Sequence, residues 1–336
     1  MSEKALLECV PNFSEGRNPK TIDAISNAIA QTPLVELLHR DVGYDANRTV
    51  FTFAGRPDAV LSALDKAVGA AVKHIDLNQQ KGAHPRIGAA DVLPLVPLRN
   101  YPEKEAIAAT AEMAEKIARD HQLPIYLYEK SAQKPERQNL ANIRRGQWEG
   151  LATKMKNPQW LPDFGPDHIH PTAGASVMGV RDFLIAFNVS LNTQEVSKVK
   201  KIAAALRESG SKTASGVHKA GKFKFLKAIG WWMPSYDAAQ VSMNFTNFRQ
   251  TPIHLVFESL EKLAHLHGLQ ILGSELIGML PEAALLESGR YFAQKENKEL
   301  DKQGQLNLAV EKMKLDKVRP FVPEERILEW CMKESF

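Results

Sequence analysis

A histidine in a loop of small residues is the side chain best placed for proton chemistry in this sequence. His84 lies in the segment 82–91, which contains glycines and a proline and is followed by the apolar run 92–97. An imidazole titrates near neutral pH, so it can accept a proton and donate it in turn. A histidine that only bonds the loop backbone is the structural alternative, because no partner base stands beside His84 in the sequence.

Asp41 is a second candidate for a chemical role. It lies near the end of a predicted strand at 34–42, and Arg48 stands where the next predicted strand begins. A surface salt bridge between Asp41 and Arg48 explains this pair as well as a functional site does. The loops that carry Asn12, Asp41 and His84 could instead converge at one end of a sheet.

Two further histidine pairs have structural alternatives. His168 and His170 have the spacing of a zinc-binding pair, but no third ligand stands at a suggestive distance, and polar contacts within a ligand-binding loop are favoured. His265 and His267 lie at the end of a predicted helix, where a histidine complements the carbonyl end of the helix dipole.

The chain is mildly basic, with a net charge of +4 at pH 7. This charge suits an anionic small ligand or a loose nucleic-acid contact, and it does not decide between the two. Lysines concentrate in one short stretch, at Lys212, Lys219, Lys222, Lys224 and Lys227. They predict either a solvated strand face or a groove for a polyanion such as RNA or a polyglutamate tail. The aromatic pattern of an RNA-binding ferredoxin-like domain is missing.

Composition places the chain among globular proteins. Its 336 residues are 44% hydrophobic and 24% charged, which predicts one or two domains. With two cysteines, Cys9 and Cys331, we expect no disulfide framework and a reducing, cytoplasmic location. We expect neither a signal peptide nor a membrane span. The sequence has no glycine-rich dinucleotide or phosphate loop, no GxSxG motif and no CxxC motif.

Two segments repeat one order of predicted elements. The first, 5–97, reads as strand, helix, strand, strand, helix, strand, with Asn18 as the cap of its first helix. The second, 183–278, repeats this order and ends in two short apolar strand segments, 269–272 and 276–280.

This repeat predicts an α+β fold of two ferredoxin-like (βαββαβ) subdomains, 1–181 and 182–336, each an antiparallel-rich sheet with helices packed on one face. The uncovered sheet faces are expected to pack together or to line a cleft. The first subdomain continues with a helix at 103–120, a strand at 125–128 and a long loop at 157–174 that prolines and glycines interrupt. A loop of this length within a compact protein is usually functional or disordered.

Several motifs in chain order resemble the formiminotransferase domain family. The resemblance covers nearly the whole chain and is carried by Glu8–Gly16, Asn47–Val50, His84–Arg86, Gly88–Ala89, Asp91–Val92, Tyr126–Tyr128, Pro162–Pro166, Phe183–Asn188, Gln240–Ser242 and Gly273–Gly278. Ordered matches over this length are far more specific than any single motif.

The resemblance implies an activity and a set of site residues. Proteins of this family transfer the formimino group of N-formimino-L-glutamate to N5 of tetrahydrofolate, in histidine degradation, and the reaction requires no metal. The family's catalytic histidine falls on His84 and its assisting aspartate on Asp41, while Arg48 and Arg86 are candidates for binding substrate carboxylates. The family's folate-contact loop falls on Gly165, Pro166, Asp167, His168, Ile169, His170, Pro171, Thr172, Ala173 and Gly174.

The sequence departs from the family pattern at five positions that bear on substrate detail. Ala83 and His39 stand where acidic residues are frequent, and Asp167, His168 and His170 stand where uncharged residues are common. The resemblance also implies a cytoplasmic homodimer with small-molecule substrates and no nucleic-acid or membrane partner. The cyclodeaminase domain of bifunctional relatives is not expected in this chain, and a separate cyclodeaminase would be a partner.

Three alternatives stay open at the level of sequence. Within the enzymes, the donor or acceptor could carry a formyl group, as in N-formylglutamate or 5-formyltetrahydrofolate, which differs from formimino by one oxygen-for-nitrogen exchange. Outside the enzymes, the chain could be a folate-binding protein without activity or a basic RNA-binding protein.

Overall fold

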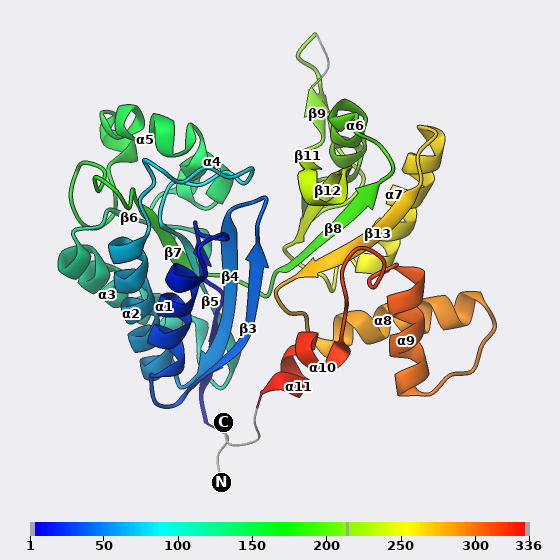
Figure 1. Cartoon of the computed structure of the whole chain (residues 1–336), viewed down its shortest axis with the longest axis horizontal. Coiled ribbons are helices and arrows are strands. Elements are labelled where there is room, and N and C mark those ends of the chain that lie inside the picture. The colour runs from blue at the N-terminus through cyan, green and yellow to red at the C-terminus, as the bar shows by residue number, and fades with distance from the viewer. Residues whose placement is uncertain (1–3, 213–214, 333–336) are drawn as a thin grey trace. The chain divides into compact units, whose positions relative to one another are not determined.

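The computed structural model describes residues 4–212 and 215–332. These residues form two compact units, of which one extends to Asp182 and the other spans Phe183–Cys331 (Figure 1). Both units are mixed α and β, with antiparallel strands and packed helices. Within the described ranges no helix combines the length and apolar character that a bilayer span requires.

The first unit is built on a seven-stranded sheet. Its strands are β1 (Leu6–Cys9), β2 (Asn12–Phe13), β3 (Val35–Gly43), β4 (Arg48–Gly55), β5 (Ala90–Arg99), β6 (Ile125–Leu127) and β7 (Ser176–Val180). Its helices are α1 (Pro19–Ala30), α2 (Pro57–His74), α3 (Glu103–His121), α4 (Leu140–Arg144) and α5 (Gln147–Met155), with 3-10 turns η1 (Glu129–Ser131), η2 (Pro135–Arg137) and η3 (Pro158–Trp160).

Four strand positions form the antiparallel part of this sheet. β1 and β2 together act as one interrupted strand between β4 and β5, and β3 lies on the far side of β4. β7 then pairs parallel to β5, and β6 pairs parallel to β7. Parallel neighbours need a long connection, and the helices α3, α4 and α5 lie in the connections that link these strands.

Strand alternation separates the two faces of this sheet. Phe51, Phe53, Leu93 and Leu95 belong to one buried apolar cluster with side chains of α1, α2 and α3. On the opposite face Val92 belongs to a smaller cluster with side chains of α4 and α5. The polar residues of the first unit that concern function lie mostly on this second face.

Helix starts follow the sequence signals. Asn18 caps α1, its side chain accepting a hydrogen bond from the Lys20 amide, and Pro19 occupies the first helical position. Proline likewise opens α2 at Pro57, where its missing N–H costs no helical hydrogen bond. The Asn18 cap predicted from the sequence is therefore confirmed.

The second unit has a four-stranded antiparallel sheet in the order β11–β12–β8–β13. Its strands are β8 (Ile185–Leu191), β11 (Leu226–Met233), β12 (Ala238–Phe245) and β13 (Ile271–Ile277), with a separate pair β9 (Ser211–Lys212) and β10 (His218–Lys219). Its helices are α6 (Val196–Leu206), α7 (Ile253–Leu266), α8 (Glu282–Lys295), α9 (Lys302–Lys312), α10 (Pro323–Arg326) and α11 (Leu328–Cys331), and η4 (Pro234–Tyr236) is a 3-10 turn.

The core of the second unit lies on one face of this sheet. Phe187, Val189, Val241 and Met243 enter a buried cluster with side chains of α6, α7 and the C-terminal helices. His267 is the C-cap residue of α7, as the sequence predicted for the His265–His267 pair.

Several elements were not predicted from the sequence, among them β2, α4, α5 and β7, and the last strand differs in its extent. The strand β7 was not predicted, because Ser176–Val180 is short and follows a loop rich in turn residues. The last strand of the second unit was predicted as two segments, but β13 runs without a break through Gly273–Glu275. A register irregularity between Ile271 and Gly273 accommodates the glycine within the strand.

Candidate functional site

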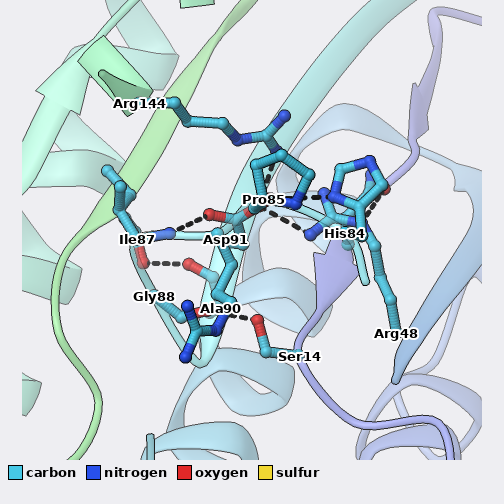
Figure 2. Close-up of polar contacts among 12 residues, drawn as sticks. Ser14, Arg48, His84, Pro85, Ile87, Gly88, Ala90, Asp91 and Arg144 are labelled. Atoms are coloured by element: carbon cyan, nitrogen blue, oxygen red, sulfur yellow. Dashed lines mark hydrogen bonds and ion pairs between the residues drawn. The ribbon is translucent and has the colours of Figure 1, made fainter. Parts of the chain in front are cut away.

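A β-bulge at the start of β5 turns a buried carboxylate toward two arginines. In the pairing with β2, Asn12 lies opposite Val92 and Phe13 lies opposite Ala90, so Asp91 is the extra residue. A bulge re-aims a side chain relative to the regular alternation of a strand. Asp91 is fully buried, and Figure 2 shows its carboxylate between the guanidinium groups of Arg48 and Arg144.

Three donors satisfy the Asp91 carboxylate. Its Oδ2 atom accepts from Arg48 Nη1 at 2.6 Å and from Arg144 Nη2 at 2.5 Å, and its Oδ1 atom accepts from the Ile87 amide at 2.8 Å. Burial acts to raise the pKa of Asp91, but the two arginines and the amide outweigh it and hold the pKa at about 2. With one carboxylate and two guanidinium groups, the cluster carries a net positive charge.

The two arginines reach Asp91 from different elements. Arg48 opens β4 and is 7% exposed, and its Nε atom also donates to the Asn12 side chain at 3.1 Å. Burial is the main cause that lowers the pKa of Arg48 to about 10. Arg144 ends the short helix α4. The ammonium of Lys154 donates to the carbonyls of Asn142 and Ile143 at 2.5 and 2.6 Å, which fixes the end of α4 from which Arg144 projects.

His84 is half-buried beside this cluster, next to Arg48 in Figure 2. Its loop is docked on the β3–β4 turn, where the Ala83 amide donates to the Asp45 carbonyl at 3.1 Å. Only glycine fits at position 82, since a Cβ atom there would lie 2.2 Å from the Ala46 carbonyl oxygen. The ring Nδ1 atom lies 2.8 Å from the Pro85 carbonyl, which can only accept, so Nδ1 carries the proton and Nε2 is the basic nitrogen.

The surroundings of His84 favour its neutral form. Burial lowers the pKa of His84 well below its ordinary value, and the positive charges of Arg48 and Arg144 lower it further. Asp91 and the bond to the Pro85 carbonyl act in the opposite direction but do not compensate. At neutral pH His84 is therefore an uncharged base, and its protonated form is a stronger acid than an ordinary imidazolium.

Arg86, a second predicted carboxylate ligand, is held by side chains of its own unit. Its Nε atom donates to Gln80 Oε1 at 2.8 Å, and its Nη1 atom donates to Glu149 Oε1 at 2.9 Å. Gln80 in turn donates to the Asn47 carbonyl at 2.9 Å, so Arg86 ties the His84 loop to the β3–β4 turn and to α5. These contacts favour a positioning role for Arg86.

Asp41 lies in the interior of the unit, which rules out the first of its two alternatives, a surface salt bridge with Arg48. Asp41 is 3% exposed, and its carboxylate lies 3.7 Å from His39 Nε2. The register places Arg48 opposite Gly43 and Asp41 opposite Val50, while the Arg48 guanidinium turns to Asp91. Both members are therefore too buried for a surface pair.

Asp41 still shares a sheet face with the His84 cluster. The pairings run across the sheet from Asp41 to Val50 on β4, from Val50 to Asn12 on β2 and from Asn12 to Val92 on β5. Directly paired residues point to the same face. Asn12, which bonds Arg48, is thus in the same row as Asp41, two strands away.

The end of the predicted folate-contact loop lies against the His84 segment. The Ala89 amide donates to the Ala173 carbonyl at 2.9 Å, and the Ala175 amide donates to the Ile87 carbonyl at 3.1 Å. Gly174 has a φ of +73°, and a Cβ atom there would lie 2.2 Å from the Ile87 carbonyl oxygen. Glycine thus permits the close approach of the two segments.

The two histidines of this loop have separate roles. His170 Nδ1 accepts from the Ala173 amide at 3.0 Å, which closes the loop on itself. His168 is 74% exposed at its side chain and pairs at 3.1 Å with Asp167, which is 84% exposed. Among residues 4–212 and 215–332, no three or more His, Cys, Asp or Glu side chains gather as metal ligands would.

Asp91 and Arg144 were missed as site residues by the sequence analysis. Asp91 lies in the same segment as His84, but a β-bulge in a run of small residues cannot be predicted from the sequence. Arg144 lies in an arginine-containing polar segment 53 positions away from Asp91. Only the packing of α4 on the sheet brings them together, and no local pattern encodes it.

Comparison with known proteins identifies the family. The N-terminal subdomain model of the formiminotransferase domain matches residues 6–181, and the model of the formiminotransferase domain matches residues 186–333. The chain belongs to the formiminotransferase domain family. The expected family resemblance is therefore confirmed over nearly the whole chain.

Relatives of this formiminotransferase domain chain include single-function and bifunctional proteins. It is 40% identical to "Glutamate formimidoyltransferase" of Streptococcus pyogenes serotype M1, over 89% of this chain and 96% of that protein. It is 43% and 42% identical to "Formimidoyltransferase-cyclodeaminase" of Dictyostelium discoideum and Mus musculus, over 98% of this chain and 61% and 60% of those proteins. The chain thus spans about 60% of the length of its bifunctional relatives.

Proposed function

We propose that this protein is a glutamate formimidoyltransferase, which moves the formimino group of N-formimino-L-glutamate to N5 of tetrahydrofolate. The observation that carries the proposal is the neutral His84, held beside a positively charged cluster, in a chain of this family. Tetrahydrofolate is the co-substrate in this proposal. One-carbon transfer in histidine degradation is the process to which the reaction belongs.

His84 would move one proton between two nitrogens. Attack by N5 on the amidinium carbon gives a tetrahedral adduct in which N5 carries an extra proton. His84 Nε2 accepts that proton as a base and then donates it to the glutamate nitrogen, whose bond to carbon breaks as the new amidinium forms. The lowered pKa of His84 serves both steps, because the ring is neutral when it must accept and strongly acidic once protonated.

The charged groups around His84 would bind the substrates. Arg48 and Arg144 share one carboxylate, so the cluster retains attraction for a substrate carboxylate, which both reactants contain. Asp41 shares the sheet face of Asn12 and would stabilise the cationic formimino carbon as the assisting aspartate. The loop 165–174 would contact the folate, and its end is already fixed against the His84 segment.

The remaining expectations are proposals of the same kind. We propose that each unit is a ferredoxin-like subdomain, 1–181 and 182–336, on the basis of the strand orders β3–β4–β1/β2–β5 and β11–β12–β8–β13. A cytoplasmic homodimer remains the family-based proposal.

A comparison of two donors tests this function. The purified protein is incubated with tetrahydrofolate and either N-formimino-L-glutamate or N-formyl-L-glutamate, and released glutamate is measured. We expect turnover with the formimino donor and at least a tenfold lower rate with the formyl donor, which carries no cationic carbon for Asp41 to stabilise (about 1.4 kcal/mol). Faster turnover with the formyl donor would favour the formyl alternative, and no turnover with either would overturn the proposal.

A further inference from the structure

The second unit buries a polar cluster on the sheet face opposite its helices. Along β8, Phe187 and Val189 enter the apolar core, whereas Asn188 and Ser190 alternate to the other face. The register pairs Asn188 with Glu275 on β13. It likewise pairs Ser190 with Gln240 on β12, which brings polar side chains from three strands to one place.

Glu275 is at the centre of this cluster and is 4% exposed. Its Oε1 atom accepts from Asn188 Nδ2 at 3.2 Å and from Gln240 Nε2 at 3.1 Å, and its Oε2 atom accepts from the Tyr236 hydroxyl at 2.8 Å. Gln240 is itself held by the Trp231 indole, which donates to its Oε1 atom at 3.1 Å.

The donors around Glu275 are all neutral. In the part of the chain that the structure describes, no lysine, arginine or histidine forms an ion pair with it. Burying a carboxylate without a cation is costly, and neutral hydrogen bonds repay only part of that cost. Such an arrangement suits a site in which the ligand supplies the missing N–H donors or positive charge.

Three residues of this polar cluster lie in segments that carry the family resemblance. Asn188, Gln240 and Glu275 come from three separate segments that carry the family resemblance, Phe183–Asn188, Gln240–Ser242 and Gly273–Gly278. The proton transfer assigned to His84 uses none of them. The cluster is thus specific in composition and has no role in the chemistry described so far.

We infer that Glu275 binds the planar N–C–N edge of a substrate, with Asn188 and Gln240 holding the carboxylate in place. The inference rests on the proposed function, because both reactants carry such an edge: the amidinium of the formimino donor, and the 2-amino-N3 edge of the pterin ring. Two parallel N–H donors match the two oxygens of a carboxylate. Tyr236 is the exchangeable partner, since it is half-buried and comes from the 3-10 turn η4, whereas the amides come from strands.

The test is the variant Glu275→Gln, which removes the charge and keeps the shape. Binding of N-formimino-L-glutamate and of tetrahydrofolate is measured separately by titration calorimetry under anaerobic conditions. We expect one of the two ligands to bind about ten- to a hundredfold more weakly, which is the loss expected for a charge-assisted pair. The weakened ligand identifies which edge Glu275 binds.

Glu258→Gln is the matched control within the same unit. Glu258 is also a largely buried carboxylate, but it is paired with the Lys295 ammonium and the Tyr291 hydroxyl. We expect this control to leave both affinities within about twofold of wild type. Tyr236→Phe should retain both affinities within about threefold, because the ligand displaces that hydroxyl.

Several results would overturn the inference. Unchanged affinities for both ligands in Glu275→Gln would do so, as would a loss of more than about tenfold in Tyr236→Phe. If Glu275→Gln does not fold, Glu275→Asp replaces it, and wild-type affinities for both ligands in that variant contradict the inference. If the wild-type protein catalyses the transfer and Glu275→Gln binds both ligands normally, this inference is wrong but the proposed function stands. If the wild-type protein binds neither ligand, the proposed function is wrong as well.

Discussion

The two units order their four antiparallel strands in the same way and bury their main apolar core under helices on one face of that sheet. Both bury polar side chains on the other face, which in the first unit α4 and α5 also contact. In the first unit one carboxylate, Asp91, is shared by Arg48 and Arg144, and the cluster is positive. Among the described residues of the second unit, Glu275 accepts from neutral donors, and its carboxylate gives the cluster a negative formal charge.

The difference shows that charge on these sheet faces is set by a few side chains and not by the strand order. The second cluster draws on three strands and the adjacent turn η4. The first cluster needs Arg144 from α4, which belongs to the connection between β6 and β7. The additional segment of the first unit thus supplies the second guanidinium, which turns a neutral Arg48–Asp91 pair into a positive cluster and adds to the lowering of the His84 pKa by burial and by Arg48.

The substitution Asp91→Asn breaks the first cluster most severely. It leaves two largely buried guanidinium groups without their shared anion, and we expect a loss of about 3–5 kcal/mol in the free energy of unfolding at pH 7. Because the pKa of Asp91 is held at about 2, the stability difference from wild type should shrink as pH falls toward that value.

Urea denaturation of wild type, Asp91→Asn and Asp120→Asn checks this expectation. Asp120 lies at the surface, paired with Lys116 and Arg119, and its loss should leave the free energy of unfolding close to that of wild type. Equal stability of the Asp91 and Asp120 variants would show that the buried cluster is not the anchor described here.

The substitution Arg144→Met sharpens the comparison by removing one positive charge. Arg144 lowers the pKa of His84, so its loss should raise that pKa toward the ordinary value of about 6.5. A protonated His84 cannot act as the base, so the acid limb of kcat/KM should move to higher pH. In wild type this limb should lie well below pH 6.5.

The pH dependence of kcat/KM for wild type, Arg144→Met and Arg145→Met tests this shift. Arg145 is the exposed neighbour of Arg144 and donates to the Asn142 side chain, so its variant should keep the wild-type profile. An identical acid limb in all three proteins would show that the charge of Arg144 does not lower the pKa of His84.

The smallest effect is expected in the predicted folate-contact loop. Asp167 and His168 point to solvent and pair with each other, so the double variant Asp167→Ala, His168→Ala should leave the thermal midpoint unchanged. If they contact folate, the KM for tetrahydrofolate should rise by about two- to fivefold, with kcat retained. A fall in kcat at constant KM would argue against a binding role for these side chains.

Much of the fold follows from the sequence because its signals are local. Asn18 and Pro57 mark helix starts, and apolar alternation marks β8 and β12. The missed strand β7 has five residues, all buried, so it lacks the polar–apolar alternation of a half-exposed strand.

The site could be predicted only in part. His84 stood out because a histidine among glycines and a proline is a local feature. The Asp91 bulge depends on pairing with β2, and the bond from Arg144 depends on the packing of α4, so both are tertiary properties. Asp41 was linked to Arg48 because the two are close in sequence. The strand register pairs Asp41 with Val50, and the Arg48 guanidinium forms its ion pair with Asp91.

Single-turnover transfer in the His84→Ala variant tests most directly whether His84 is the proton carrier. With N-formimino-L-glutamate and tetrahydrofolate, we predict a rate lower by about a hundredfold or more, unchanged tetrahydrofolate binding and a wild-type thermal midpoint. His74→Ala, at the exposed end of α2, should transfer at the wild-type rate. A near-normal rate in His84→Ala would contradict the assignment of proton transfer to the first unit's positive cluster.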